Sequence, residues 1–115
     1  LIALALLAPL HAVEAAEAPG LLTRDIAVPH HGEKKMGLAV WYPAESGAET
    51  VFAENPVFRG GLVRKGAAPK AGKHPVVMLS HGMGGSYLSL NWLASGLAAR
   101  GAVVVGVNHP NGWFQ

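Results

Sequence analysis

Two short stretches of this chain carry the residues that could do chemistry. The first is Ser-His-Gly-Met-Gly-Gly-Ser at residues 80–86, and the second is Asn-His-Pro at residues 108–110. Glycine lets backbone N–H groups face outward in conformations that a Cβ would obstruct. N–H groups gathered just before a helix begins attract negative charge. The first stretch therefore predicts an anion site, either for the oxyanion of an acyl-transfer reaction or for the phosphates of a dinucleotide.

The serines and histidines of these stretches also raise the question of nucleophilic catalysis. A serine nucleophile is deprotonated by a histidine, and it often lies in a Gly-x-Ser-x-Gly turn. Ser80 has methionine two positions before it and Ser86 has leucine two positions after it, so neither serine fits this turn. His81 and His109 are candidate bases, but we expect His81 to shape the turn by hydrogen bonding instead.

The surrounding sequence predicts the elements that position these stretches. Residues 76–79 are all apolar, as expected of a strand that is covered on both faces, and residues 102–107 form a second apolar run. Between the two runs, one buried helix face is predicted by the spacing of Leu90, Leu93, Ala94, Leu97 and Ala98. Ser86 or Ser89 can cap the start of this helix. A strand, a helix and a strand in this order predict a parallel, right-handed unit.

The chain before this unit predicts an antiparallel hairpin and then a long loop. Residues 23–30 and 37–42 alternate between polar and apolar around a turn with glycine. Residues 44–73 contain seven glycines and prolines, which leave no room for a long element. We expect this basic segment to be a solvated loop. Its apolar residues are expected to pin it to the sheet: Val51, Phe52, Val57 and Phe58.

Residues 1–15 are identified as a signal peptide whose charged start is missing. An apolar run at residues 1–8 is followed by small residues, as in the hydrophobic and cleavage regions of such signals. Val13 and Ala15 occupy the −3 and −1 positions of a cut before Ala16. The run is short of the about 20 residues that span a membrane. We therefore expect an exported protein, periplasmic or extracellular, with no stable membrane span.

The composition narrows the class of protein further. Half of the residues are hydrophobic and 14% are charged, which is typical of a chain with a core. The absence of cysteine excludes disulfides, thiolate metal sites and a cysteine nucleophile. A net charge of +2 is too small to argue for a nucleic-acid partner. Adjacent residues on a strand point to opposite faces, so His30 and His31 do not predict a metal site.

The order of elements and the two polar stretches resemble the opening of the α/β-hydrolase fold. His81-Gly82 and the glycines after it look like the oxyanion segment that follows the third strand of that fold. The stretch at 108–110 resembles the Asp-His-Pro-Gly segment of dienelactone-hydrolase-like and platelet-activating-factor-acetylhydrolase-like proteins. Bacterial polyester hydrolases also have a similar sequence around these segments. Asn108 stands where these proteins often have Asp, and Asn111 where they often have Gly.

This resemblance covers about residues 24–115, roughly the first third of such a domain. It implies that residues 16–115 are the N-terminal part of one α/β-hydrolase domain, incomplete at its C-terminal end: an antiparallel hairpin followed by a parallel βαβ unit. By resemblance, the backbone N–H of Met83 donates to the oxyanion, supported by His81, Gly82 and Gly84. The nucleophile, acid and base would lie downstream, outside this chain.

The implied function is that of an exported serine ester hydrolase. Its substrate would be a small-molecule, lipid or polyester ester, and the reaction would use neither cofactor nor metal. The fragment alone is expected to be inactive.

Two alternatives stay open. The first is a dinucleotide-binding oxidoreductase, because Gly82 and Gly84 could begin a G-x-G-x-x-G fingerprint. Its third glycine position is Tyr87, and Asn108 stands where an acidic residue is expected. The second is a hydrolase-fold protein without catalysis, because no triad is visible.

Overall fold

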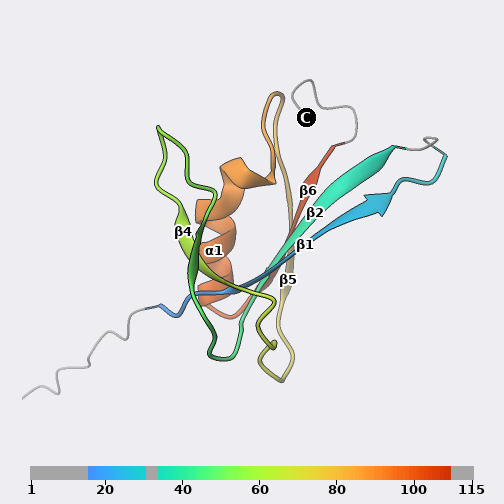
Figure 1. The fold of residues 1–115 in the computed structure, drawn as a ribbon. Helices are drawn as coiled ribbons and strands as arrows, with labels where there is room; N and C mark the ends of the chain where they lie inside the picture. The colour runs from blue at the N-terminus through green and yellow to red at the C-terminus, as the bar shows by residue number, and fades with distance from the viewer. Residues whose placement is uncertain (1–15, 31–33, 110–115) are drawn as a thin grey trace, which may run out of the picture.

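The computed structural model describes residues 16–30 and 34–109. They form a curled six-stranded sheet with one α-helix in its concave side, an α/β arrangement (Figure 1). In chain order the elements are β1 (Gly20–Ala27), β2 (Lys35–Tyr42), β3 (Thr50–Phe52), β4 (Gly61–Lys65), β5 (Val76–Ser80), a 3₁₀ turn η1 (Tyr87–Leu90), α1 (Asn91–Ala99) and β6 (Val103–Asn108).

The strand order across the sheet is β3-β4-β1-β2-β6-β5. β1 and β2 pair antiparallel, with Leu21 opposite Trp41, which confirms the predicted hairpin. β5 and β6 pair in parallel through the crossover helix α1, which confirms the predicted strand–helix–strand unit. β2 joins the two parts because it pairs antiparallel with β6. The first strand begins at Gly20, three residues before the sequence pattern places it.

The core lies between the sheet and α1. Trp41 on β2 and Val104 on β6 are fully buried beside Ala94 and Ala98 of the helix. The indole Nε1 of Trp41 donates a 2.9 Å hydrogen bond to Oδ1 of Asn91, so the one polar side chain buried in the core of the described residues is satisfied. This bond fixes the first residue of α1 against the middle of the sheet.

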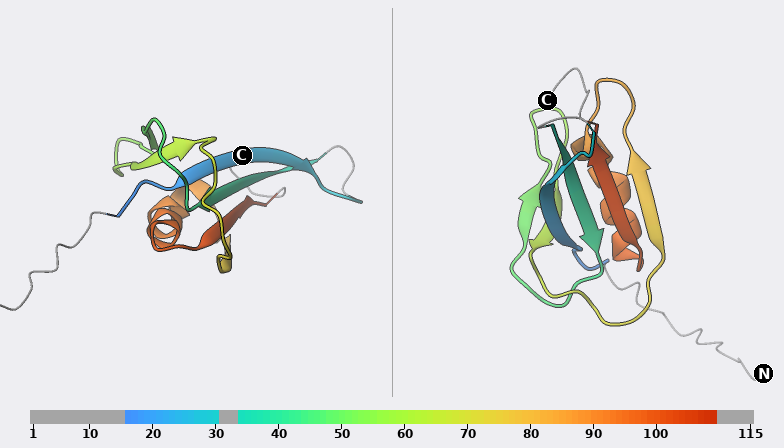
Figure 2. Two further views of the ribbon diagram at one scale, coloured as in Figure 1. Left: turned by 90° about the horizontal axis from the view of Figure 1, so that it is seen from below. Right: turned by 90° about the vertical axis from the view of Figure 1, so that its right-hand side faces the viewer.

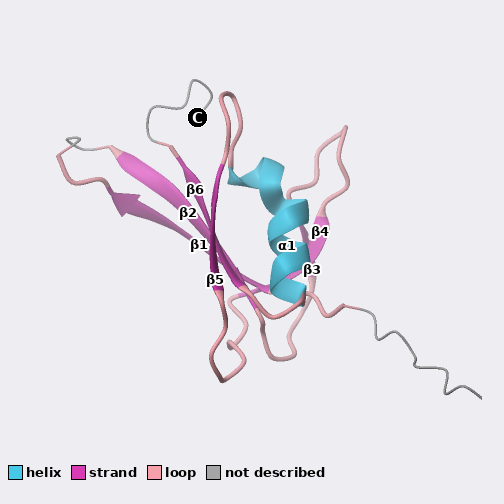
Figure 3. Cartoon of the chain, turned by 180° about the vertical axis from the view of Figure 1, so that it is seen from behind, coloured by secondary structure: helices cyan, strands magenta, loops and turns pink. Residues whose placement is uncertain are grey.

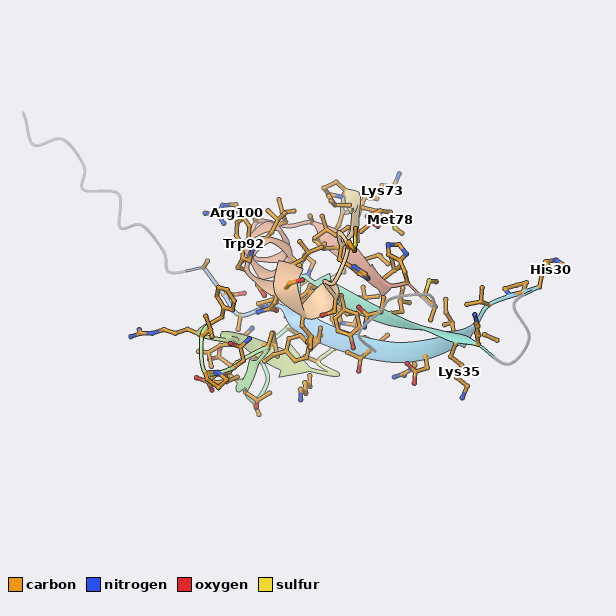
Figure 4. All side chains as sticks on the ribbon, turned by 90° about the horizontal axis from the view of Figure 1, so that it is seen from above. His30, Lys35, Lys73, Met78, Trp92 and Arg100 are labelled. Carbon is orange, nitrogen blue, oxygen red and sulfur yellow. The ribbon has the colours of Figure 1, made fainter. Side chains whose placement is uncertain are left out.

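No described helix covers the opposite face of β5 and β6 (Figures 2 and 3). Val76 and Met78 are each 65% exposed, and Met78 points outward from the sheet (Figure 4). The expectation that residues 76–79 are covered on both faces is therefore wrong for the described chain. The reason is that β5 is an edge strand with α1 on one side only.

The segment 44–73 is not the structureless loop that its glycines and prolines suggest. It contains β3 and β4; β3 is the edge strand, and β4 pairs with it and, in parallel, with β1. Gly61 is the first residue of β4 and Gly66, with a φ of 66°, lies in the turn directly after it, so neither glycine interrupts the strand. Val63 of β4 is fully buried, and Phe52 packs edge-on against Trp41.

The other apolar residues of this segment do not pin it to the sheet. Val57 is 81% exposed and Phe58 is also exposed, because both lie in a turn held by Asn55. The Oδ1 atom of Asn55 accepts hydrogen bonds from both of their backbone N–H groups. Val51 is exposed as well.

Within the described part of the chain, no helix is long and apolar enough to cross a membrane.

Candidate functional site

The two polar stretches meet at the carboxyl ends of β5 and β6. These strands are parallel neighbours with Ser80 opposite Val107, so the residues that follow them lie side by side. The 81–86 turn projects from this end of the sheet and leads into η1 and α1 (Figure 1). In open α/β sheets, this edge is where ligands bind. The candidate site therefore consists of the turn after β5 together with Asn108 and His109 at the end of β6.

A pair of histidines links the turn after β5 to the end of β6. The backbone N–H of His109 donates a 3.2 Å hydrogen bond to Nε2 of His81, and the two imidazole rings lie 4.5 Å apart between centroids. The hydroxyl of Ser80 lies 2.7 Å from Nε2 of His109. The sequence alone indicates all three residues but not these contacts. They depend on the pairing of β5 with β6, which brings together residues 28 positions apart.

The carbonyl oxygen of Gly82 is held by two donors. The backbone N–H of Gly85 lies 3.1 Å from it, and Nδ1 of His81 lies 2.8 Å from it. Gly84 completes this turn with a φ of 75°, a conformation that favours glycine. In a trans peptide the C=O and N–H groups point in opposite directions, so the N–H of Met83 faces away from these donors. None of the hydrogen bonds between described residues uses that N–H, and the Met83 side chain is 96% exposed.

Ser86 and Asn108 fix the start of the helical segment behind this turn. The hydroxyl of Ser86 accepts a 3.1 Å hydrogen bond from the N–H of Leu88, so Ser86 caps η1, while α1 itself begins at Asn91 without a side-chain cap. Oδ1 of Asn108 accepts a 2.7 Å hydrogen bond from the N–H of Tyr87. Asn108 therefore links the end of β6 to the start of η1. In the sequence this residue stands out only as an asparagine where an acidic residue is expected, and no local pattern indicates its partner.

The charged pair of Glu17 and Lys70 lies away from the two polar stretches. In residues 16–30 and 34–109 no group of three histidine, cysteine or acidic side chains could hold a metal ion. A hydrogen bond from Lys70, together with its charge, holds the pKa of Glu17 below its usual range. That pair lines a cavity of about 310 Å³ with His74 and Arg100. The cavity lies beyond the amino end of β5 and the last turn of α1, so it does not coincide with the polar turns.

A comparison with solved structures gives one likeness of note. The ferulic acid esterase from Streptomyces cinnamoneus matches with a TM-score of 0.63 and 26% sequence identity over 80% of this chain. The match covers 33% of the esterase, so this chain spans about a third of that enzyme's length. No family model and no curated protein matches the sequence. The comparison supports an esterase-like α/β fold.

Proposed function

We propose that this chain is the N-terminal part of a serine ester hydrolase with an α/β-hydrolase fold. The observation that carries the proposal is the N–H of Met83, which faces away from the two donors to the Gly82 carbonyl and makes no hydrogen bond among the described residues, in a glycine-rich turn at the carboxyl edge of the sheet. Such a donor stabilises the oxyanion that forms when a serine attacks an ester carbonyl. One donor of this kind is typically worth about 2.7–4 kcal/mol in the transition state. The likeness to a ferulic acid esterase supports the same reaction class.

In this proposal the remaining parts of the reaction come from polypeptide that follows residue 115. The serine is acylated there and then deacylated by water, with no cofactor and no metal. Small-molecule, lipid and polyester esters are the candidate substrates. The name of the structural neighbour makes a ferulic acid ester the first substrate to test.

The dinucleotide alternative gains no support from the geometry. Tyr87 stands at the third glycine position and packs edge-on against Trp41, with ring centroids 6.3 Å apart. Its backbone N–H is bound to Asn108, where a ribose-binding carboxylate would be needed. A close approach of the helix to a pyrophosphate is therefore not favoured here.

The test uses the protein encoded by the complete gene. We expect it to hydrolyse a short-chain nitrophenyl ester or a feruloyl ester and to be labelled by a serine-reactive fluorophosphonate. Peptide mapping should place the labelled serine outside residues 16–109. Absence of both turnover and labelling would show a hydrolase fold without catalysis. A label on Ser80 would instead show that the Ser80–His109 pair is itself the nucleophile and base.

Export is a separate part of the proposal. Expressed with its complete leader, the protein should be recovered outside the cytoplasm with its N-terminus near Ala16, because residues 1–15 have the pattern of a secretory signal. N-terminal sequencing of the recovered protein measures this directly. A folded cytoplasmic protein that keeps its leader would contradict it.

A further inference from the structure

We propose that His81 is a positioning residue which, as a neutral imidazole protonated on Nδ1, holds the Gly82–Met83 peptide with its N–H outward. The proposal rests on the function proposed above, because it explains how the oxyanion donor would be aimed. The proposal has two parts: His81 carries its proton on Nδ1, and in this form it holds the orientation of the Gly82–Met83 peptide. Each part follows from contacts at the ends of β5 and β6.

The protonation state follows from the partners of the two ring nitrogens. Nε2 of His81 faces the backbone N–H of His109, which can only donate, so Nε2 must accept and carries no proton. The proton of the neutral ring is then on Nδ1, which faces the carbonyl oxygen of Gly82 and can donate to it. The ring thus receives a hydrogen bond from His109, directly after β6, and gives one to the turn after β5.

The mechanical role follows from how little else holds the turn. A Cβ built on Gly82 would meet no atom within 4 Å, so packing does not fix this residue. The backbone dihedral angles of glycine are also less restricted than those of other residues, so the Gly82–Met83 peptide can flip when its carbonyl oxygen loses its hydrogen bonds. Only His81 and Gly85 donate to that carbonyl among the described residues. Removal of the imidazole leaves one restraint where there were two.

The ring of His81 is itself held in place from two strands. The His109 ring packs against it, and Ser80 at the end of β5 lies within hydrogen-bond distance of the His109 ring. The orientation of the Met83 N–H is therefore connected to the β5–β6 pairing through side chains. A turn held only by its own residues would lack this connection.

The kinetic test compares three variants of the full-length enzyme. In His81→Asn the side-chain amide can still donate near the position of Nδ1, whereas His81→Ala loses both bonds. We expect His81→Ala to lower kcat by about 10-fold or more, up to the about 10²–10³-fold that loss of an oxyanion donor costs, with little change in KM. His81→Asn should recover a large part of kcat. Affinity for a boronic acid transition-state analogue should fall in parallel with kcat.

His74→Ala is the matched control. His74 is also partly buried and has its Nδ1 3.1 Å from a backbone carbonyl, that of Gly101, but it lies at the opposite end of β5. We expect this variant to keep wild-type kcat. If His81→Ala kept wild-type kcat as well, or if His74→Ala lost as much as His81→Ala, the positioning role would be wrong.

A spectroscopic test is independent of catalysis. In the nitrogen–proton correlation spectrum of the imidazoles, His81 should show the pattern of a neutral ring protonated on Nδ1. The amide signal of Met83 should shift in His81→Ala and return toward its wild-type position in His81→Asn. A ring protonated on Nε2, or a Met83 signal that does not respond to either variant, would overturn the inference. A wild-type enzyme without ester turnover would overturn the proposed function, and these spectra would still decide the role of His81.

Discussion

At the scale of single residues, our proposal gives a role to the backbone of Met83 and none to its side chain. The residue as a whole is 96% exposed. We therefore expect Met83→Ala to keep most of the activity of the full-length enzyme. Met83→Pro removes the N–H and should lower kcat by about 10² or more.

These two variants are measured with the same ester, and circular dichroism checks that both are folded. The comparison separates the contribution of the Met83 main chain from that of its side chain, because only the proline variant lacks the backbone N–H. Wild-type kcat in both variants would show that the Met83 N–H is not the oxyanion donor.

Asn108 gives a second prediction at this scale, on stability. Its Oδ1 accepts the N–H of Tyr87, and Asn108→Ala would leave that part-buried donor without this partner. We expect the substitution to lower the free energy of unfolding by about 1–3 kcal/mol. Asn108→Asp keeps an acceptor at the same place and should cost much less. Urea unfolding of the two variants measures the difference, and equal losses would contradict the assigned role.

Residue types alone indicated the candidate site but not its connections. A serine, a histidine and three glycines within residues 80–85 are a local signal, so Ser80, His81 and the turn after them could be named from the sequence. The bond from His109 to His81 and the bond from Tyr87 to Asn108 join residues 28 and 21 positions apart. Only the register of β5 against β6 brings such residues together, and no local pattern encodes that register.

At the scale of elements, the hairpin was predictable from its alternation, α1 from the helical spacing of its apolar residues, and β5 and β6 from their continuous apolar runs. β3 and β4 were not predictable, because they lie among glycines and prolines and form no continuous apolar run. β4 is a strand because it finds β1 as a partner, with Leu21 opposite Lys65. The pairing that makes the segment regular comes from tertiary structure, so the local composition of residues 44–73 predicted a loop.

Gly106 shows how closely β6 approaches its neighbours. A Cβ at this position would lie 3.0 Å from a ring carbon of Trp41 and 3.1 Å from the Cβ of Tyr87. Both neighbours are fixed by packing, so we expect Gly106→Ala to destabilise the protein by about 1–3 kcal/mol. Thermal unfolding of the full-length protein measures this loss.

Gly96→Ala is the control for this prediction. Gly96 lies inside α1, where an added Cβ would only meet the end of the Arg100 side chain at 3.7 Å. Alanine is the better helix former by about 1 kcal/mol, so this variant should be as stable as the wild type or more stable. The prediction for Gly106 would be contradicted if both substitutions changed the melting temperature in the same direction by the same amount.

At the scale of the whole molecule, the described chain has one covered and one open sheet face. The open face carries apolar side chains on three adjacent strands: Leu38, Val40, Val76, Met78, Val103, Val105 and Val107. All of them are exposed or half-buried, while Val104 and Trp41 on the other face are fully buried. The chain spans about a third of the esterase that it resembles. In our proposal, the polypeptide beyond residue 115 covers the open face.

The last prediction is that residues 16–115 alone neither fold stably nor hydrolyse esters. β5 pairs only with β6 among the described strands, so its other edge presents N–H and C=O groups that can pair with another chain. Each large apolar side chain left in water forfeits roughly 1.5–3 kcal/mol of burial. Several such side chains together exceed the about 5–15 kcal/mol by which a typical domain is stable.

The test is to express residues 16–115 and to measure both thermal unfolding and the cleavage of a short-chain nitrophenyl ester. We expect aggregation or a broad, non-cooperative transition, because β5 offers a free edge beside an apolar face. We expect no turnover either, because the nucleophile is proposed to lie downstream. A cooperative transition together with turnover that Ser80→Ala abolishes would contradict both expectations. The close contact of Ser80 with His109 would then be a catalytic pair, and the site would be complete within this chain.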